Sequence, residues 1–262
     1  MAGHRHAPGL ASRPGTLVAV LTQYCPIEVA AEIVAERWNL LIIRDLMGPG
    51  RGFNDLHRCL PRMSRSLLAE RLRRLERAGV VTRTPHGSGR LVEYRLTEAG
   101  RELEPLLLAL GDWSVRRLFG DPTPEQLDPA MLAFRMSEKV RAGRLPSRRT
   151  VVELRCRRPE SRQWLLLDPA GSTACSLDPG QPVDVVVTGD TAELQRWFIG
   201  RRRFGEALAA GTITITGPRS VATEFPGWFD AATPWHDTIA RLADQSDSAT
   251  GGRPAAAPTV EA

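Results

Sequence analysis

Arginine is the residue type in this sequence that most clearly indicates a binding chemistry. Only Lys139 of its 35 basic residues is a lysine, and the chain carries a net charge of +5 at pH 7. Residues 51–90 hold ten arginines against three acidic residues. Guanidinium groups bind phosphate through planar, paired N–H donors. This concentration of positive charge indicates a polyanionic partner, although a genome-wide bias toward arginine codons would produce it too.

The four cysteines suggest a second chemistry, which is redox sensing. They stand too far apart for a disulfide scaffold, at Cys25, Cys59, Cys156 and Cys175. Cys25 begins a predicted helix, whose dipole favours a thiolate, although Glu28 opposes this. A sensing thiol and an inert, half-buried thiol both remain open, and we favour the inert thiol because the chain has a separate candidate sensor domain. His57 and Cys59 lack further ligands at usable spacing, so we predict no metal site.

No set of residues in the sequence indicates catalysis. The five histidines are scattered, and there is no Gly-x-Ser-x-Gly elbow and no phosphate-binding loop. There is also no apolar run of about 18 residues, and residues 1–15 lack the apolar core of a signal peptide. We therefore expect a cytoplasmic protein that is not an enzyme, has no cofactor and does not associate with a membrane.

Hydrophobic periodicity in the first half predicts helices followed by a β-hairpin. The expected elements are helices over 27–47 with a break near Arg37, over 54–60 and over 64–79, strands over 80–86 and 90–97, and a helix over 97–119. Ser64 is a good N-cap and Gly79 a good left-handed C-cap, so the third helix has well-marked ends.

The predicted helix over 64–79 has an apolar face and a cationic face. At 100° per residue, Leu68, Leu72 and Leu75 lie on one side, while Arg73 and Arg77 lie on the other. With the preceding helix and the turn at Pro61 this is a helix-turn-helix pattern, and the hairpin behind it is a wing. A solvated basic helix is the alternative. The residues that we predict to contact DNA are Arg62, Ser64, Arg65, Ser66, Arg73, Arg77, Arg83 and Arg90.

Residues 25–113 resemble the HxlR-type winged-helix transcriptional regulators, which are relatives of the MarR group. The matching residues are Cys25-Pro26, Trp38 with LLIIRDL, Phe53-Asn54-Asp55-Leu56, the helix Met63–Gly79, Val92 to Arg101, and Trp113. The resemblance implies a homodimer that reads a near-palindromic operator and dimerises through residues 27–35 and 103–118. The sequence departs from the family pattern at Glu36-Arg37, where Gly-Lys is usual, and at Gly89-Arg90-Leu91, where the wing usually has a proline.

The second half of the sequence has a different pattern of predicted elements, which indicates a separate core. A linker with three prolines, 121–129, precedes a helix over 130–141. Strands are then expected over 150–157, 162–168, 172–177, 182–189 and 211–217, with helices over 191–199, 204–210 and 219–229. This mixture is typical of an α+β domain.

Residues 149–229 resemble the sterol carrier protein type-2 family, on the strand and helix around VDVVVTGDTAEL, the helix RRRFGEALAAG, the strand GTITITG and the closing FPGWF. The resemblance implies a sheet with helices around an apolar tunnel. The aromatic residues that would line an effector pocket are Trp164, Trp197, Phe204, Phe225, Trp228 and Phe229. A filled hydrophobic core is the alternative for each of them.

These observations predict an α+β protein with an N-terminal winged helix-turn-helix domain and a C-terminal sterol-carrier-like domain. The expected divisions are a disordered tail over 1–15, the DNA-binding and dimerisation domain over 16–120, a linker helix over 121–146, the ligand domain over 147–242 and a disordered tail over 243–262. The predicted function is that of a homodimeric regulator that binds double-stranded DNA under the control of an apolar ligand. A lipid-binding protein whose winged helix contacts other proteins, or a redox regulator using Cys25, are the alternatives.

Overall fold

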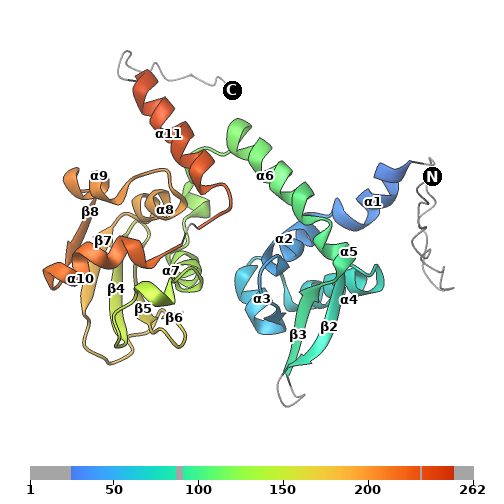
Figure 1. Ribbon diagram of the computed structural model, residues 1–262, viewed down its shortest axis with the longest axis horizontal. Helices are drawn as coiled ribbons and strands as arrows, with labels where there is room; N and C mark the ends of the chain where they lie inside the picture. Colours follow the sequence, from blue (N-terminus) through green and yellow to red (C-terminus); the bar gives the residue numbers. More distant parts are fainter. Residues whose placement is uncertain (1–24, 87–90, 231, 251–262) are drawn as a thin grey trace, which may run out of the picture. The chain divides into compact units, whose positions relative to one another are not determined.

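The computed structural model describes residues 25–86, 91–230 and 232–250, and these fold as two compact units that divide between Glu104 and Pro105 (Figure 1). We call them unit 1 and unit 2. The sequence predicts the corresponding boundary at residue 120, one helix later. None of the helices in the described ranges is both long enough and apolar enough to cross a bilayer.

Unit 1 has the element order of a winged helix. Its helices are α1 (Pro26–Val34), α2 (Arg37–Leu46), α3 (Phe53–Cys59), α4 (Arg65–Arg77) and α5 (Glu98–Arg101), and its strands are β1 (Arg51–Gly52), β2 (Val81–His86) and β3 (Leu91–Leu96). The predicted break near Arg37 and the predicted hairpin are confirmed. The two-residue strand β1 was not predicted, because two residues carry no periodicity. It pairs with β3 through Arg51 opposite Tyr94, which ties the wing to the turn before α3.

A stripe of leucines packs α4 into unit 1. Leu68, Leu72 and Leu75 are at most 1% exposed, as the amphipathic pattern predicted. They share the core with Ile42 and Ile43 of α2, which are fully buried. The opposite side of α4 is therefore the side that faces water.

The end of α4 is joined to the base of the wing by a small hydrogen-bonded corner. Gly79 has φ of +73°, the left-handed conformation predicted for a C-cap. The Thr97 hydroxyl donates to the Gly79 carbonyl at 2.5 Å and accepts from the Gly100 amide at 3.0 Å, so Thr97 also caps α5. A side chain at Gly100 would collide with the Val80 carbonyl. The wing is thus held at a set angle to α4.

The single helix predicted over 97–119 is in fact two helices. The structure ends α5 at Arg101 and begins α6 (Glu104–Arg117) after a short break. Pro105 explains the break, because proline has no N–H to continue the hydrogen-bond ladder of α5 but is well tolerated in the first turn of a new helix.

Unit 2 is a five-stranded mixed sheet with helices. Its strands are β4 (Thr150–Arg157), β5 (Glu160–Leu167), β6 (Thr173–Cys175), β7 (Val185–Gly189) and β8 (Ile213–Thr216), in the order β6-β5-β4-β7-β8. Its helices besides α6 are α7 (Pro129–Glu138), α8 (Thr191–Ile199), α9 (Phe204–Ala209), α10 (Arg219–Glu224) and α11 (His236–Thr250), with short turns of 3₁₀ helix at Pro124–Gln126, Ala142–Arg144 and Phe225–Trp228. All five predicted strands are present, and only β4 and β7 pair in parallel.

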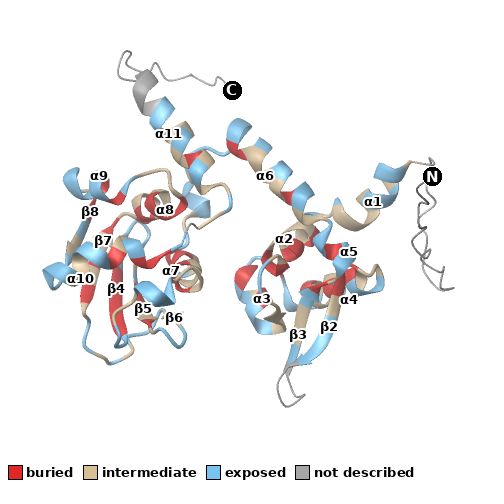
Figure 2. Cartoon of the chain, viewed as in Figure 1, coloured by how far each residue is buried: buried red, intermediate tan, exposed pale blue. Residues whose placement is uncertain are grey.

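The core of unit 2 lies on one face of this sheet, and Figure 2 shows buried residues in β4 and α8. Alternate residues of β4, among them Val152 and Leu154, point to the same side as Leu165 of β5. Helices α7, α8 and α9 cover this side, with Met136, Leu194 and Ala207 fully buried. The α+β class expected for this half of the chain is confirmed.

Helix α11 corrects two expectations at the C-terminal end. The predicted last helix, 219–229, is α10 followed by a 3₁₀ turn, and the predicted tail beginning at 243 instead continues α11 as far as Thr250. The segment is poor in large apolar residues, which made it resemble a disordered tail. This segment nevertheless continues a helix that is anchored one turn earlier, where Ile239 is 4% exposed.

The back of α4 is held by one carboxylate, that of Glu36. This residue is the N-cap of α2, and its two oxygens form ion pairs with Arg71 and with Arg74, the second at 2.6 Å. Arg74 also donates to the Glu32 carbonyl at 2.7 Å. Glu36 stands where the resembled family usually has glycine, and the structure shows that this departure ties the α1–α2 junction to α4.

Replacing Glu36 with alanine should loosen α4. The substitution leaves the Arg71 guanidinium, which is 17% exposed, without its carboxylate. We expect a loss of local stability of about 1–2 kcal/mol, seen as a roughly 5- to 30-fold faster exchange of the α4 amides in hydrogen-exchange mass spectrometry. Glu70→Ala, at an exposed position of the same helix, is the matched control. Equal exchange rates in both variants would show that the Glu36 ion pairs do not stabilise α4.

Candidate nucleic-acid interface

The water-facing side of α4 is a narrow cationic strip. Ser66, Glu70, Arg73 and Arg77 are all exposed, and they lie opposite the buried leucines. The predicted rotation of the helix is confirmed, since Leu67 and Ala78 at the edges of the apolar face are half-buried. The strip therefore presents two arginines and one glutamate along its length.

The beginning of α4 is capped by its own sequence. The Ser64 side chain accepts a hydrogen bond from the Leu67 amide at 3.3 Å, and its hydroxyl lies 3.2 Å from that of Ser66. Ser64 and Ser66 are small and polar, and Arg65 between them is turned toward Asn54 and Phe53, so a ligand can approach the backbone closely beside the two serines. The partial positive charge of a helix N-terminus also favours an anion there.

Arg73 and Arg77 are held so that part of each guanidinium group is available to a ligand. The Nε of Arg73 donates to the Ala69 carbonyl at 3.2 Å, and the Nε of Arg77 donates to the Arg73 carbonyl at 3.4 Å. These bonds hold each side chain along the helix. The terminal amino groups of both guanidinium groups lie outside the two bonds, and these are the donors that a phosphate or a guanine edge uses.

Arg65 has a different environment from the one that sequence alone suggests. Its Nη2 donates to Asn54 Oδ1 at 2.7 Å, and its guanidinium lies 5.0 Å from the centre of the Phe53 ring. Arg65 thus holds the start of α4 against α3 while remaining exposed. Arg62, in the turn between the two helices, is exposed as well.

Of the two wing arginines predicted to contact DNA, the structure describes one. Arg83 on β2 is exposed and pairs in register with Tyr94 of β3. Arg90, the other predicted wing contact, lies outside the described residues. Arg95 on β3 is paired with Glu93 at 2.7 Å, so part of the positive charge near the wing is neutralised internally.

Arg71 and Arg74 have a structural role that the sequence pattern does not reveal. Both belong to the arginine-rich stretch that predicted a polyanionic partner, yet both face Glu36 and not the exposed strip. The helical period places both arginines outside the cationic face. Their partner, Glu36, is one of the two residues at which the sequence departs from the family pattern before Trp38. The net charge of residues 51–90 therefore overstates the charge that an external ligand meets.

The aromatic residues predicted to line an effector pocket are mostly packed against one another. Ring centroids lie 4.8 Å apart for Trp197 and Phe204, 5.5 Å for Trp197 and Phe225, and 5.3 Å for Phe225 and Phe229. Trp228 packs edge-on against Phe225. Trp164 is separate from these five. In the sheet it lies opposite Glu153 of β4 and Cys175 of β6. The next residue, Leu165, faces the helices, so Trp164 is on the other face of the sheet.

Cys25 is half-exposed and is the residue before the first turn of α1. Cys59 and Cys156 are buried, and burial raises the pKa of the Cys156 thiol. Among the four thiols, Cys25 and Cys175 are thus the more accessible ones, and burial followed by the charge of Asp178 raises the pKa of Cys175.

The winged-helix elements agree with known proteins. The family described as HxlR-like helix-turn-helix matches residues 33–119. YdeP, an HTH-type transcriptional regulator of Bacillus subtilis, is 31% identical over 117 residues, which are 44% of this chain and 87% of that protein. YvaP of the same organism is 34% identical over 114 residues, 42% of this chain and 96% of that protein. A solved structure of the redox regulator HypR in its reduced form has 31% identity, covers 34% of this chain and 90% of that chain, and has a TM-score of 0.33. From the match to the family and the near-complete coverage of these relatives, the chain belongs to the HxlR-like helix-turn-helix family of transcriptional regulators.

Proposed function

We propose that this regulator acts in the cytoplasm and reads double-stranded DNA through the exposed strip of α4 and the β2–β3 wing. The observation that carries the proposal is the two-sided character of α4, whose leucines are buried while Arg73 and Arg77 are exposed. Such a helix fits the major groove, and arginines can reach phosphates or guanine edges from it. The proposed contact residues are Arg62, Ser64, Arg65, Ser66, Arg73, Arg77, Arg83 and Arg90.

We also propose that the protein binds as a homodimer to a near-palindromic operator. Leu106, Leu110 and Trp113 of α6 are 48–52% exposed and recur at helical spacing on one face. Ile27 and Val29 of α1 are exposed as well. Both helices fall in the regions expected to dimerise from the family resemblance. An exposed apolar stripe of this kind is stabilised when a second copy covers it.

Unit 2 supplies the proposed regulatory input, an apolar small molecule bound by a sterol-carrier-like domain. What supports the proposal is the five-stranded sheet with helices over one face and the large set of aromatic residues beneath them. A ligand among Trp197, Phe225 and Phe229 must separate rings that touch in the described state, so it would select a second, more open state of unit 2.

The arginines of the strip can be tested against a matched arginine of the same helix. Arg73→Ala or Arg77→Ala should weaken operator binding about tenfold and lower the slope of log affinity against log salt by roughly 0.9, the value for one lost phosphate contact. Arg74→Ala, which removes the same charge from the side facing Glu36, should leave the slope unchanged. Fluorescence anisotropy over a salt series measures both quantities.

An unchanged slope in all three variants would contradict the proposed interface. The runner-up function, an apolar-ligand carrier whose winged helix contacts proteins, predicts that the purified protein prefers no genomic fragment over random duplex. Sequencing of the genomic fragments that it retains separates these two functions.

The apolar stripe of α6 can be tested by its effect on mass in solution. Leu110→Glu places a charge in the middle of the stripe and should convert the dimer to a monomer, as measured by light scattering coupled to gel filtration. Leu208→Glu places the same charge at an exposed leucine of α9, outside the regions expected to dimerise, and should stay dimeric. If both variants are monomers, or if both are dimers, the dimer interface does not lie on this stripe.

Redox sensing through Cys25 is a second candidate function, favoured by the accessibility of this thiol ahead of α1. It predicts that diamide changes operator affinity and that Cys25→Ser abolishes this response while leaving the affinity of the untreated protein intact. Cys175→Ser, at the other accessible thiol, is the control. An identical diamide response in wild type and Cys25→Ser excludes the mechanism.

A further inference from the structure

Helices α6 and α11 form a groove that the proposed DNA-binding function does not use. Its volume is about 350 Å³, and we call it the α6–α11 groove. Its lining residues are Val115, Arg116 and Phe119 at the end of α6, Arg201 after α8, and Ile239, Leu242, Ala243 and Gln245 of α11. All of them belong to unit 2, and none belongs to the aromatic set discussed above.

The two walls of the groove are joined at its base. Trp235, just before α11, donates its indole N–H to the Leu108 carbonyl of α6 at 3.0 Å. Its ring occupies the space beside Gly111, where even a methyl group would overlap the indole. Helix α11 therefore starts from a defined point on α6, and residues of both helices line the groove beyond it.

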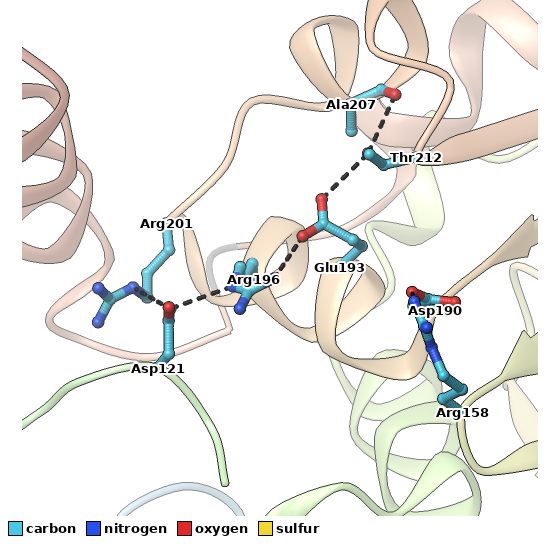
Figure 3. Close-up of polar contacts among 8 residues, drawn as sticks. All are labelled: Asp121, Arg158, Asp190, Glu193, Arg196, Arg201, Ala207 and Thr212. Carbon is cyan, nitrogen blue, oxygen red and sulfur yellow. Dashed lines mark hydrogen bonds and ion pairs between the residues drawn. The ribbon is translucent and has the colours of Figure 1, made fainter. Parts of the chain in front are cut away.

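The chain after α6 is anchored by a charge network (Figure 3). The Asp121 carboxylate accepts from Arg196 at 3.1 Å and pairs with Arg201 at 3.4 Å. The hydrogen bond from Arg196, with the nearby positive charges, lowers the pKa of Asp121, so this carboxylate stays ionised at neutral pH. Arg201 also donates to the Phe119 carbonyl at 2.9 Å. These contacts hold the Arg201 guanidinium, whose side chain is 24% exposed, at the wall of the groove.

The lining combines an apolar surface with positive charge and includes no carboxylate. Five lining side chains are apolar, and two are guanidinium groups. Arg201 has five N–H donors, and the contacts with Phe119 and Asp121 involve two of its nitrogens, Nη1 and Nε. Arg116 pairs through Nη1 with Asp112, one turn back on α6. Both guanidinium groups thus keep donors that a planar anion can engage in pairs.

We propose that the α6–α11 groove binds an amphipathic monocarboxylate, with its carboxylate between Arg116 and Arg201 and its apolar body against Phe119, Ile239 and Leu242. A volume of about 350 Å³ is near the lower end of the range of small-molecule pockets. Decanoate is our probe for this class of ligand. The proposal concerns binding alone, so it stands or falls independently of DNA recognition.

Equilibrium dialysis of the full chain against radiolabelled decanoate, below its micellar concentration and without DNA, tests the assignment. We expect saturable binding, with decanol competing at least about tenfold more weakly because it cannot accept charged hydrogen bonds from both arginines. Arg116→Gln should weaken decanoate binding about tenfold. Arg117→Gln is the matched control, since it removes the same charge from the neighbouring, exposed position that does not line the groove.

A second variant tests the apolar body of the site. Ala243→Phe fills the groove without changing its charge and should abolish binding while the circular dichroism of the chain is retained. If this variant fails to fold, the Arg116 and Arg117 pair still decides the question. Absence of saturable binding by the wild type, equal affinity for decanol, or equal losses in the two arginine variants overturns the proposal. If a second copy of the chain covers the groove, the wild type will show no saturable binding.

Discussion

Burial of Leu68, Leu72 and Leu75 sets the rotation of α4 about its own axis, and the functional surface of unit 1 depends on that rotation. Each of these leucines is almost completely removed from water, which stabilises the fold by about 1.5–3 kcal/mol per side chain. Because successive residues turn by about 100°, burying this stripe is enough to place Arg73 and Arg77 on the opposite side of the helix. The two requirements, a packed core and a cationic exterior, are met by one periodic pattern.

Electrostatics then divides the arginines into two groups. Glu36 pairs with Arg71 and Arg74 behind α4, and Asn54 with Phe53 engages Arg65 at its start. Within the described parts of the chain, Arg73 and Arg77 instead bond only to carbonyls of their own helix through Nε. A charged group that faces a carboxylate contributes to stability, whereas one that faces only water can bind a ligand without first breaking an ion pair. Arginine therefore both fixes α4 to the rest of unit 1 on one side and leaves two cationic side chains exposed on the other.

Unit 2 shows the same division between filled and open space. Its aromatic residues pack at centroid distances of 4.8–6.4 Å, the range of favourable ring contacts, and they complete the core under α8 and α9. The open space lies instead at the α6–α11 groove, where two helices meet at a tryptophan and a glycine and leave arginines at the wall. Aromatic content thus identified the core of this unit, and helix packing created its candidate binding site.

The sequence by itself determined the local elements, their caps and the apolar faces, because helix period, Ser64, Gly79 and Thr97 act over a few residues. It also determined the winged-helix order and the α+β character of the second half. Only the tertiary structure decided the partner of Glu36, the separate position of Trp164, the strand β1 and the docking of α11 on α6. Each of these joins residues far apart in the chain or rests on two or three residues, and neither a long separation nor so short a segment leaves a periodic signal that can be read from one sequence.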